Sequence, residues 1–303
     1  MRHFLFRLLL LGTALDGALA QYALQIGNVA WPGGYRCFSG TEYPNTVNFT
    51  LAKTENGSRA YAVTAGPSTT TGNFNRQLSS GLNRLNYQLY PANARSFILK
   101  APPSATANEV ISGRSHAQAG TGIPLSFLFC IPPGQIVFPG TYTDSITVSV
   151  YRNYNDPGNP MNSRTITLSA VVIPEAVLAV VPRGSGFSDS TSQNLNFGTL
   201  TQGQRLGCDL LVRRNTGCNL TFSSLNNGVL KAIPTPTTDQ VPYVCTVNGT
   251  RLNLATRRQI SLPAGLSSSA DGERLPIDIT IGNLADAAAG DYQDQIVIAV
   301  VAN

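Results

Sequence analysis

The sequence predicts an all-β fold built from two β-sandwiches in tandem. Apolar and polar side chains alternate along many short stretches, such as Val47 to Leu51 and Tyr142 to Val150. Gly, Pro, Asn and Ser interrupt these stretches at short intervals, as expected for strands joined by turns. Charged residues make up only 12% of a chain that contains 28 Gly and 19 Pro, and no helical periodicity of similar strength competes.

The first twenty residues have the features of a secretory signal peptide. Arg2 and Arg7 give a basic start, the run from Phe4 to Leu11 is apolar, and Ala18-Leu-Ala20 offers a small-x-small cleavage site. That run is too short to span a membrane, and no later stretch reaches the roughly 18 apolar residues that a span needs. We therefore expect residues 1–20 to be removed on export.

The rest of the chain contains an internal repeat with an offset of 150 residues. The stretch GTYTDSITVSV (140–150) recurs as GDYQDQIVIAV (290–300), with the same Gly, Tyr, Asp and alternating apolar positions. Upstream, the apolar positions of 125–131 align with those of 275–281 at the same offset. Such self-similarity predicts two homologous units, and we expect domains at 21–174 and 175–303.

The two copies differ after the repeated strand. Beyond Val150 the chain passes through the turn-rich stretch 153–162 into Arg164–Val172, where apolar residues alternate again. Beyond Val300 only three residues remain in the sequence. We therefore expect the first domain to contain its last strand and the second to lack its final strand.

Such a gap has a large energetic consequence. A missing strand removes about four or five apolar side chains from the core, each contributing roughly 1.5–3 kcal/mol when buried. That loss is comparable to the whole stability of a domain, and it leaves an open strand edge that a donated strand can pair with. We expect Tyr292, Ile296, Ile298 and Val300 to line the donor-strand groove. The alternative is a sandwich that is complete without a further strand.

The repeated motifs also carry a family resemblance. Both halves contain a tyrosine-bearing strand, then an apolar strand, a loop and the Gly-x-Tyr-x-Asp strand, and the second half adds Asn196–Leu200 and Ser224–Leu230. This arrangement resembles the spore coat protein U domain, which is shared with subunits of archaic (Csu-type) chaperone–usher pili. The resemblance implies two tandem immunoglobulin-like β-sandwich domains, the second completed by a strand from a neighbouring subunit.

The other end of the chain suggests a place in such a fibre. Only about ten residues separate Gln21 from Trp31, and we expect the first domain to use them as its own first strand. A subunit that accepts a strand and donates none would sit at the distal end, as a two-domain tip adhesin. The resemblance then implies four partners: a periplasmic chaperone, an outer-membrane usher, the N-terminal donor strand of the next subunit, and an abiotic or host surface. The protein would pass through the periplasm to the pilus tip. The alternatives are a secreted coat or matrix protein and a stand-alone carbohydrate-binding sandwich.

Strand alternation predicts where adhesion would occur. The first domain leads into the second near Val172, so the loop before its last strand should lie at the opposite, distal end. Exposed apolar residues at a loop tip indicate a contact surface. We expect adhesive loops that include Val110, Ile111, Tyr154, Pro157 and Met161, whereas Phe97 and Leu99 are equally compatible with a core position.

All five cysteines lie after the signal peptide, which favours disulfides in an exported protein. We expect Cys37 to pair with Cys130, since they are alone in their domain. Among the other three we favour Cys218 with Cys245, leaving Cys208, although sequence alone does not define connectivity. No Cys-x-x-Cys spacing is present, so we expect no metal site and no cofactor.

We also expect no enzymatic activity and no binding of nucleic acid. His116 is the only histidine after the signal peptide, and no Gly-x-Ser-x-Gly elbow is present for it to serve. Asp144 and Asp294 recur in both copies, which favours turn or strand-edge positions over a catalytic pair. The formal net charge of +5 is scattered without a basic cluster.

Overall fold

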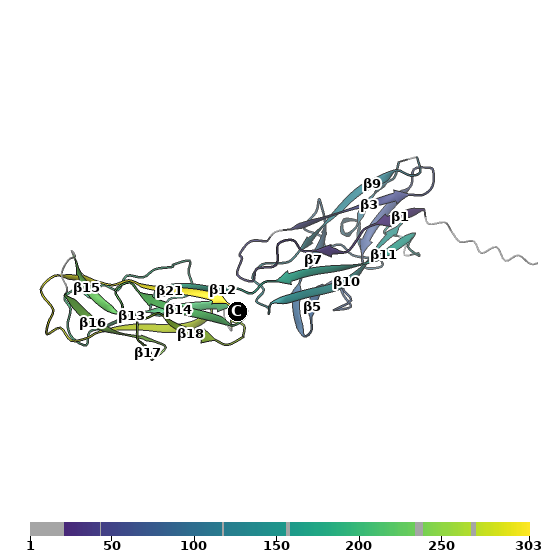
Figure 1. The fold of residues 1–303 in the computed structure, drawn as a ribbon. Coiled ribbons are helices and arrows are strands. Elements are labelled where there is room, and N and C mark those ends of the chain that lie inside the picture. Colours follow the sequence, from purple (N-terminus) through teal and green to yellow (C-terminus); the bar gives the residue numbers. More distant parts are fainter. Residues whose placement is uncertain (1–20, 43, 117, 156–157, 234–238, 268–270) are drawn as a thin grey trace, which may run out of the picture.

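The computed structural model describes residues 21–42, 44–116, 118–155, 158–233, 239–267 and 271–303, so the predicted signal peptide lies outside the described residues. The fold is all-β, with one 3₁₀ turn (Ala107–Glu109) among the described elements. Two immunoglobulin-like sandwiches are joined end to end (Figure 1). No helix in the described part of the chain has the length and apolarity to cross a membrane.

The first sandwich is formed by two sheets. One has the order β1-β3-β9-β7, formed by Tyr22–Gln25, Asn45–Lys53, Gly122–Cys130 and Gln88–Pro91. The other has the order β2-β11-β10-β4-β8, formed by Val29–Ala30, Asn162–Val172, Gly140–Tyr151, Ala60–Ala65 and Ile111–Arg114. A hairpin of β5 (Gln77–Ser80) and β6 (Asn83–Asn86) is attached to β10.

The core of the first sandwich follows the predicted alternation. From Tyr142 to Val150 of β10 and from Ile166 to Val172 of β11, every second side chain is buried, including Ile146 and Leu168. Trp31, the single tryptophan, packs edge-on against Phe129 with ring centroids 5.4 Å apart. The core is therefore closed by residues of this sandwich alone.

The second sandwich has the same layout with fewer strands in one sheet. Its larger sheet has the order β12-β13-β19-β16-β15-β20, and β17 pairs with β16. These strands are β12 (Ala176–Pro182), β13 (Arg205–Arg214), β19 (Glu273–Ile281), β16 (Gln240–Val247), β15 (Val229–Ile233), β20 (Asp291–Gln293) and β17 (Thr250–Leu252). The smaller sheet has the order β18-β14-β21, formed by Arg258–Leu262, Cys218–Ser224 and Ile296–Ala302.

A short connection and one buried amide join the two sandwiches. The side chain of Asn215 donates to the carbonyl oxygen of Ile173 over 2.9 Å and accepts from the backbone N–H of Glu175 over 2.7 Å. Beside this junction, the backbone N–H of Asn303 donates to the carbonyl of Gly217 over 2.8 Å. The end of β21 therefore lies at the end of its sandwich that faces the first (Figure 1).

The repeated Gly-x-Tyr-x-Asp motif has the same bonding in both sandwiches. The hydroxyls of Tyr142 and Tyr292 each donate over 2.8 Å to the carbonyl four residues earlier. Asp144 accepts a 2.6 Å hydrogen bond from the Tyr87 hydroxyl, and Asp294 accepts one of the same length from Tyr243. Both aspartates thus tie the strand to a neighbouring tyrosine, which is a structural role.

Candidate strand-acceptor site

The two sandwiches can be aligned strand by strand through their registers. Val150 pairs with Val63 on β4, and Val300, 150 residues later, pairs with Leu220 on β14. Leu125 pairs with Phe49, and Leu275 pairs with Leu210. The sheet β1-β3-β9-β7 therefore corresponds to β12-β13-β19-β16, and β10-β4-β8 corresponds to β21-β14-β18.

The alignment leaves two strand positions of the first sandwich without a counterpart. In the first sandwich β11 covers the outer edge of β10 from Gly140 to Val150, and β2 pairs in parallel with β11 beyond it. In the second, the described residues pair β21 only with β14, so its other edge carries no strand. This open edge is the main difference between the two copies.

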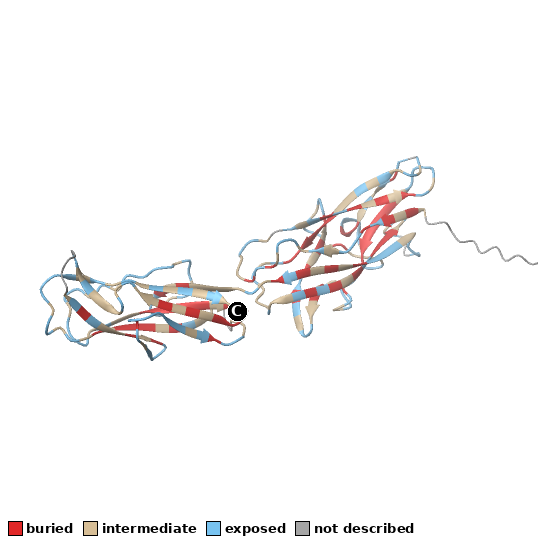
Figure 2. Ribbon diagram, in the orientation of Figure 1, coloured by how far each residue is buried: buried red, intermediate tan, exposed pale blue. Residues whose placement is uncertain are grey.

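Burial changes at the matching residues. Ile146, Val148 and Val150 are 0%, 1% and 0% exposed in the first sandwich. Their counterparts Ile296, Ile298 and Val300 face the second core, yet they are only half-buried. β21 contains intermediate and exposed residues only (Figure 2), and Val297 and Val301, on its outer face, are 50% and 62% exposed.

Half-buried apolar residues also lie on the other side of this open edge. Residues of β12 and β21 approach within 8 Å between Cα atoms. Leu178 and Val180 of β12 pack against the second core without being fully buried, as do Leu195 and Phe197 in the segment after β12. We call the half-buried residues Leu178, Val180, Leu195, Phe197, Ile296, Ile298 and Val300 the acceptor strip.

Three of the four residues expected to line a donor-strand groove lie in this strip. Ile296, Ile298 and Val300 are on the free edge strand itself. Tyr292 is instead in β20, which pairs with β15 opposite Ala232. Sequence reasoning did not assign Leu195 and Phe197 to the groove, because they lie outside the strands and Phe197 was noted only within the Asn196–Leu200 motif.

The residues expected in adhesive loops are not gathered at one surface. Val110 is only 5% exposed, so its predicted surface position is wrong, because it enters β8 beside the core. Ile111 lies in β8 opposite Val63. Tyr154 and Met161 are half-buried in the loop before β11, and Pro157 lies outside the described residues. Phe97 is 40% exposed, whereas Leu99 belongs to the core.

Neither predicted disulfide is formed in the structure, where all five cysteines are free and buried. The Cys37 thiol lies 3.6 Å from the Val137 carbonyl and 3.2 Å from the side-chain amide of Asn215. Cys218 is in the three-stranded sheet and Cys245 in the opposite one. Burial raises the pKa of the Cys245 thiol to about 12, with the nearby Cys208 adding to that effect.

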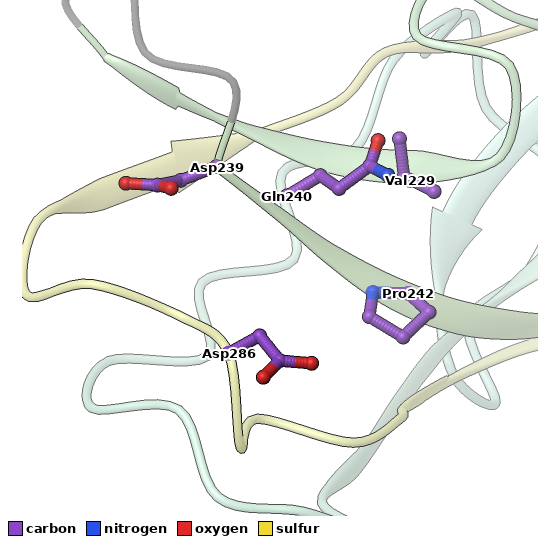
Figure 3. A pocket seen from close by; sticks show the side chains of 5 residues that line it. All are labelled: Val229, Asp239, Gln240, Pro242 and Asp286. Carbon is purple, nitrogen blue, oxygen red and sulfur yellow. The ribbon is translucent and has the colours of Figure 1, made fainter.

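Two surface hollows lie elsewhere in the second sandwich. One, of about 390 Å³, is lined by Val229, Asp239, Gln240, Pro242 and Asp286 (Figure 3). Its two carboxylates point in different directions, so they do not converge on one ligand. The other, of about 370 Å³, lies beside Asp294, just before β21. The described residues contain no group of three His, Cys, Asp or Glu side chains that could hold a metal ion.

Comparison with known proteins identifies the family of the first sandwich. Residues 25–149 match the family model described as Spore Coat Protein U domain. This match lies within the first sandwich and agrees with the resemblance that the sequence motifs carry. No curated protein sequence matches the chain.

Three solved structures illustrate what the whole chain is similar to. A chaperone–tip adhesion subunit pre-assembly complex from archaic chaperone–usher Csu pili of Acinetobacter baumannii matches with 15% identity and a TM-score of 0.49, covering 92% of this chain and 99% of that one. A tip adhesin from Pseudomonas aeruginosa matches with 8% identity and a TM-score of 0.37, covering 92% and 94%. The adhesive subunit of a fimbria of enterotoxigenic Escherichia coli matches with 15% identity and a TM-score of 0.32, covering 94% and 78%. With every TM-score below 0.5, these likenesses carry no argument about activity.

Proposed function

We propose that this chain is the tip adhesin subunit of a chaperone–usher pilus, exported to the cell surface. Its second sandwich joins the fibre by accepting a donor strand, first from a periplasmic chaperone and then, at the outer-membrane usher, from the next subunit. The observation that supports this most is the open edge of β21 beside a half-buried apolar strip, where the first sandwich has β11. Strand addition at such an edge satisfies backbone hydrogen bonds and buries alternate side chains.

The position at the tip is inferred from the first sandwich. Its described N-terminal residues are not free to be donated, since Tyr22–Gln25 pair with Thr50–Lys53 and bury the side chains of Tyr22 and Leu24. Its last strand is its own β11. A self-contained first sandwich joined to a strand-accepting second one fits a subunit that ends a fibre and presents its first sandwich outward.

Strand acceptance is tested by giving the second sandwich a strand of its own. We expect a copy of residues 153–172, fused after Asn303, to fold back along β21, because this segment connects β10 to β11 in the first sandwich. Burying four or five apolar side chains should raise the melting temperature of the second sandwich by more than about 10 °C. Calorimetry measures this transition, and the fluorescence of Trp31 identifies the transition of the first sandwich.

The control fusion carries the same twenty residues in scrambled order without apolar alternation. Equal melting temperatures for the two fusions would contradict strand acceptance by the second sandwich.

The adhesive surface is proposed at the end of the first sandwich away from the second. Strand register supports this end, since Tyr151 pairs with Ala62 and Ala60 pairs with Arg114, which brings the described residues of 54–59, 115–116, 118–121, 152–155 and 158–161 to the same end of the sandwich. None of the large apolar residues found exposed in the described chain lies in these loops. Tyr154 is a half-buried aromatic residue within these loops, so contact with an abiotic or host surface would combine its ring with polar neighbours.

Replacing Tyr154 with Ser is expected to lower attachment of piliated cells to plastic several-fold, because an aromatic contact of this kind typically contributes about 1–2 kcal/mol. Pilus number per cell is counted in parallel by electron microscopy. Phe97→Ser is the matched control, since Phe97 is 40% exposed outside the three loops. If attachment falls equally in both variants, or falls in neither, the result argues against adhesion through the loops of the distal end.

A second candidate function is a secreted coat or matrix protein, favoured by the description of the family model that matches residues 25–149. The two functions differ in their partners. Co-purification with an immunoglobulin-like chaperone from the periplasm supports the pilus subunit, and recovery as a stable free monomer supports the coat protein.

A further inference from the structure

The apolar side chains that cover the core beside the acceptor strip are not equally large along its length. They are smallest at the end of the strip that lies at the junction between the sandwiches. Resting on the strand acceptance proposed above, we infer that the strand accepted by the second sandwich carries a large apolar, preferably aromatic, side chain opposite Val300. The partner is the N-terminal segment of another subunit, running antiparallel to β21 as β11 runs to β10.

The strand registers identify which residues of each sandwich cover the core at the end that corresponds to Val150 and Val300. Leu24 pairs with Leu51 and Leu178 pairs with Val212, which makes Tyr22 and Ala176 equivalent two residues earlier. Val63 and Leu220 are likewise equivalent through their pairing with Val150 and Val300, so Tyr61 corresponds to Cys218. The closing residues are therefore Tyr22 and Tyr61 in the first sandwich, and Ala176 and Cys218 in the second.

In the first sandwich two aromatic rings cover this end of the core. The rings of Tyr22 and Tyr61 meet edge-on, with centroids 6.1 Å apart, and both residues are buried. β11 adds little apolar cover here, because it places Asn162 opposite Val150 and Arg164 opposite Val148. Tyr22 and Tyr61 belong to the same core cluster as Val148 and Val150 and supply the aromatic cover at this end.

In the second sandwich the rings are missing. Ala176 and Cys218 have short side chains that cannot replace two phenol rings. Ile298 and Val300 stay half-buried, as does Ala176 itself. A copy of β11 would again place polar side chains opposite these two residues, and so would add no apolar cover beside the half-buried Ala176.

The first sandwich also shows where a side chain at this position points. The Asn162 side-chain oxygen accepts a 3.3 Å hydrogen bond from the backbone N–H of Leu24, so this side chain is directed toward β1. The same position on an accepted strand, opposite Val300, is directed toward β12 at Leu178, the counterpart of Leu24, two residues from Ala176. An aromatic residue at this position of the accepted strand covers Val300 and the neighbouring Ala176. It lies four residues before the apolar residue opposite Ile296.

The experiment uses the full chain with residues 153–172 fused after Asn303. In the fused copy alone, Asn162→Phe places a ring opposite Val300. We expect the melting temperature of the second sandwich to rise by about 5 °C or more above that of the unchanged fusion. Ser163→Phe in the copy is the matched control, because it adds the same ring on the outward face, as the exposure of Ser163 in β11 indicates.

A second variant tests the space itself. Ala176→Tyr should stabilise the unchanged fusion and should remove the advantage of Asn162→Phe, because both rings compete for one space. One outcome would overturn this inference and leave strand acceptance intact. In it, Asn162→Phe and Ser163→Phe in the copy give equal melting temperatures, while the unchanged fusion remains more stable than the scrambled one. A scrambled fusion as stable as the unchanged one would overturn both.

Discussion

Replacing Ile296 and Ile298 together with Asp is expected to abolish capture of this protein by a periplasmic chaperone and its incorporation into pili. Both side chains face the second core on the free edge strand. A strand laid over them would have to bury two carboxylates, and buried charges without partners are strongly unfavourable. Losing the two apolar contacts alone, at roughly 1.5–3 kcal/mol each, corresponds to a decrease in affinity of at least about 100-fold.

The measurement is recovery of the chaperone with the tagged protein from periplasmic extracts, together with pilus counts. The matched control is Val297→Asp with Val301→Asp, which adds the same two charges to the exposed face of the same strand. That control should still be captured. Trp31 fluorescence should show an unchanged first sandwich in both variants, since its core does not include β21. Chaperone recovery at the wild-type level with the Ile296/Ile298 variant would show that the strip does not accept a strand.

Replacing Asp144 with Asn is expected to destabilise the first sandwich by about 2–4 kcal/mol at neutral pH. The buried carboxylate accepts hydrogen bonds from the hydroxyls of Tyr87 and Thr69, at 2.6 Å and 2.8 Å, and from the backbone N–H of Thr70 at 3.1 Å. An amide turns one of the acceptor oxygens into a donor, which faces these donors unfavourably. Thermal unfolding monitored by Trp31 fluorescence measures the loss.

The same carboxylate predicts a pH dependence. Burial by itself raises the pKa of Asp144, but the hydrogen bonds from Tyr87, Ser68, Thr69 and Thr70 outweigh it, so the pKa lies below its usual value. A depressed folded-state pKa contributes stability above the unfolded-state value, near 3.9, and that stability is lost as pH falls through the folded-state value. The difference between wild type and Asp144→Asn should therefore be constant above about pH 5 and shrink below about pH 4.

Glu42→Gln is the control for the effect of low pH on a carboxylate other than Asp144. Glu42 forms a partly exposed ion pair with Arg95 at 2.6 Å, and such pairs contribute little to stability. A difference between wild type and Asp144→Asn that stays constant down to about pH 2 would contradict the assigned role of the carboxylate.

Local pattern was enough to predict the class of fold and its duplication. Alternation with a period of two is set by the pleat of a single strand, so it identified β10, β11 and β21 from their own residues. The Gly-x-Tyr-x-Asp repeat aligned Ile296, Ile298 and Val300 with Ile146, Val148 and Val150 before any pairing was known.

Only the tertiary structure decided which residues meet across the sandwich. Val110 was expected in an exposed loop, yet it is only 5% exposed directly before β8, where Ile111 pairs with β4. Cys218 and Cys245 lie in opposite sheets, and the equivalence of Ala176 with Tyr22 appears only through strand registers. Pairing between strands joins residues far apart in the chain, and alternation within one strand carries no information about its neighbour. The sequence therefore determined the alternation of β21 and its match to β10, whereas only the fold decided that the described residues pair β21 on one edge and where the apolar lining of the other edge is smallest.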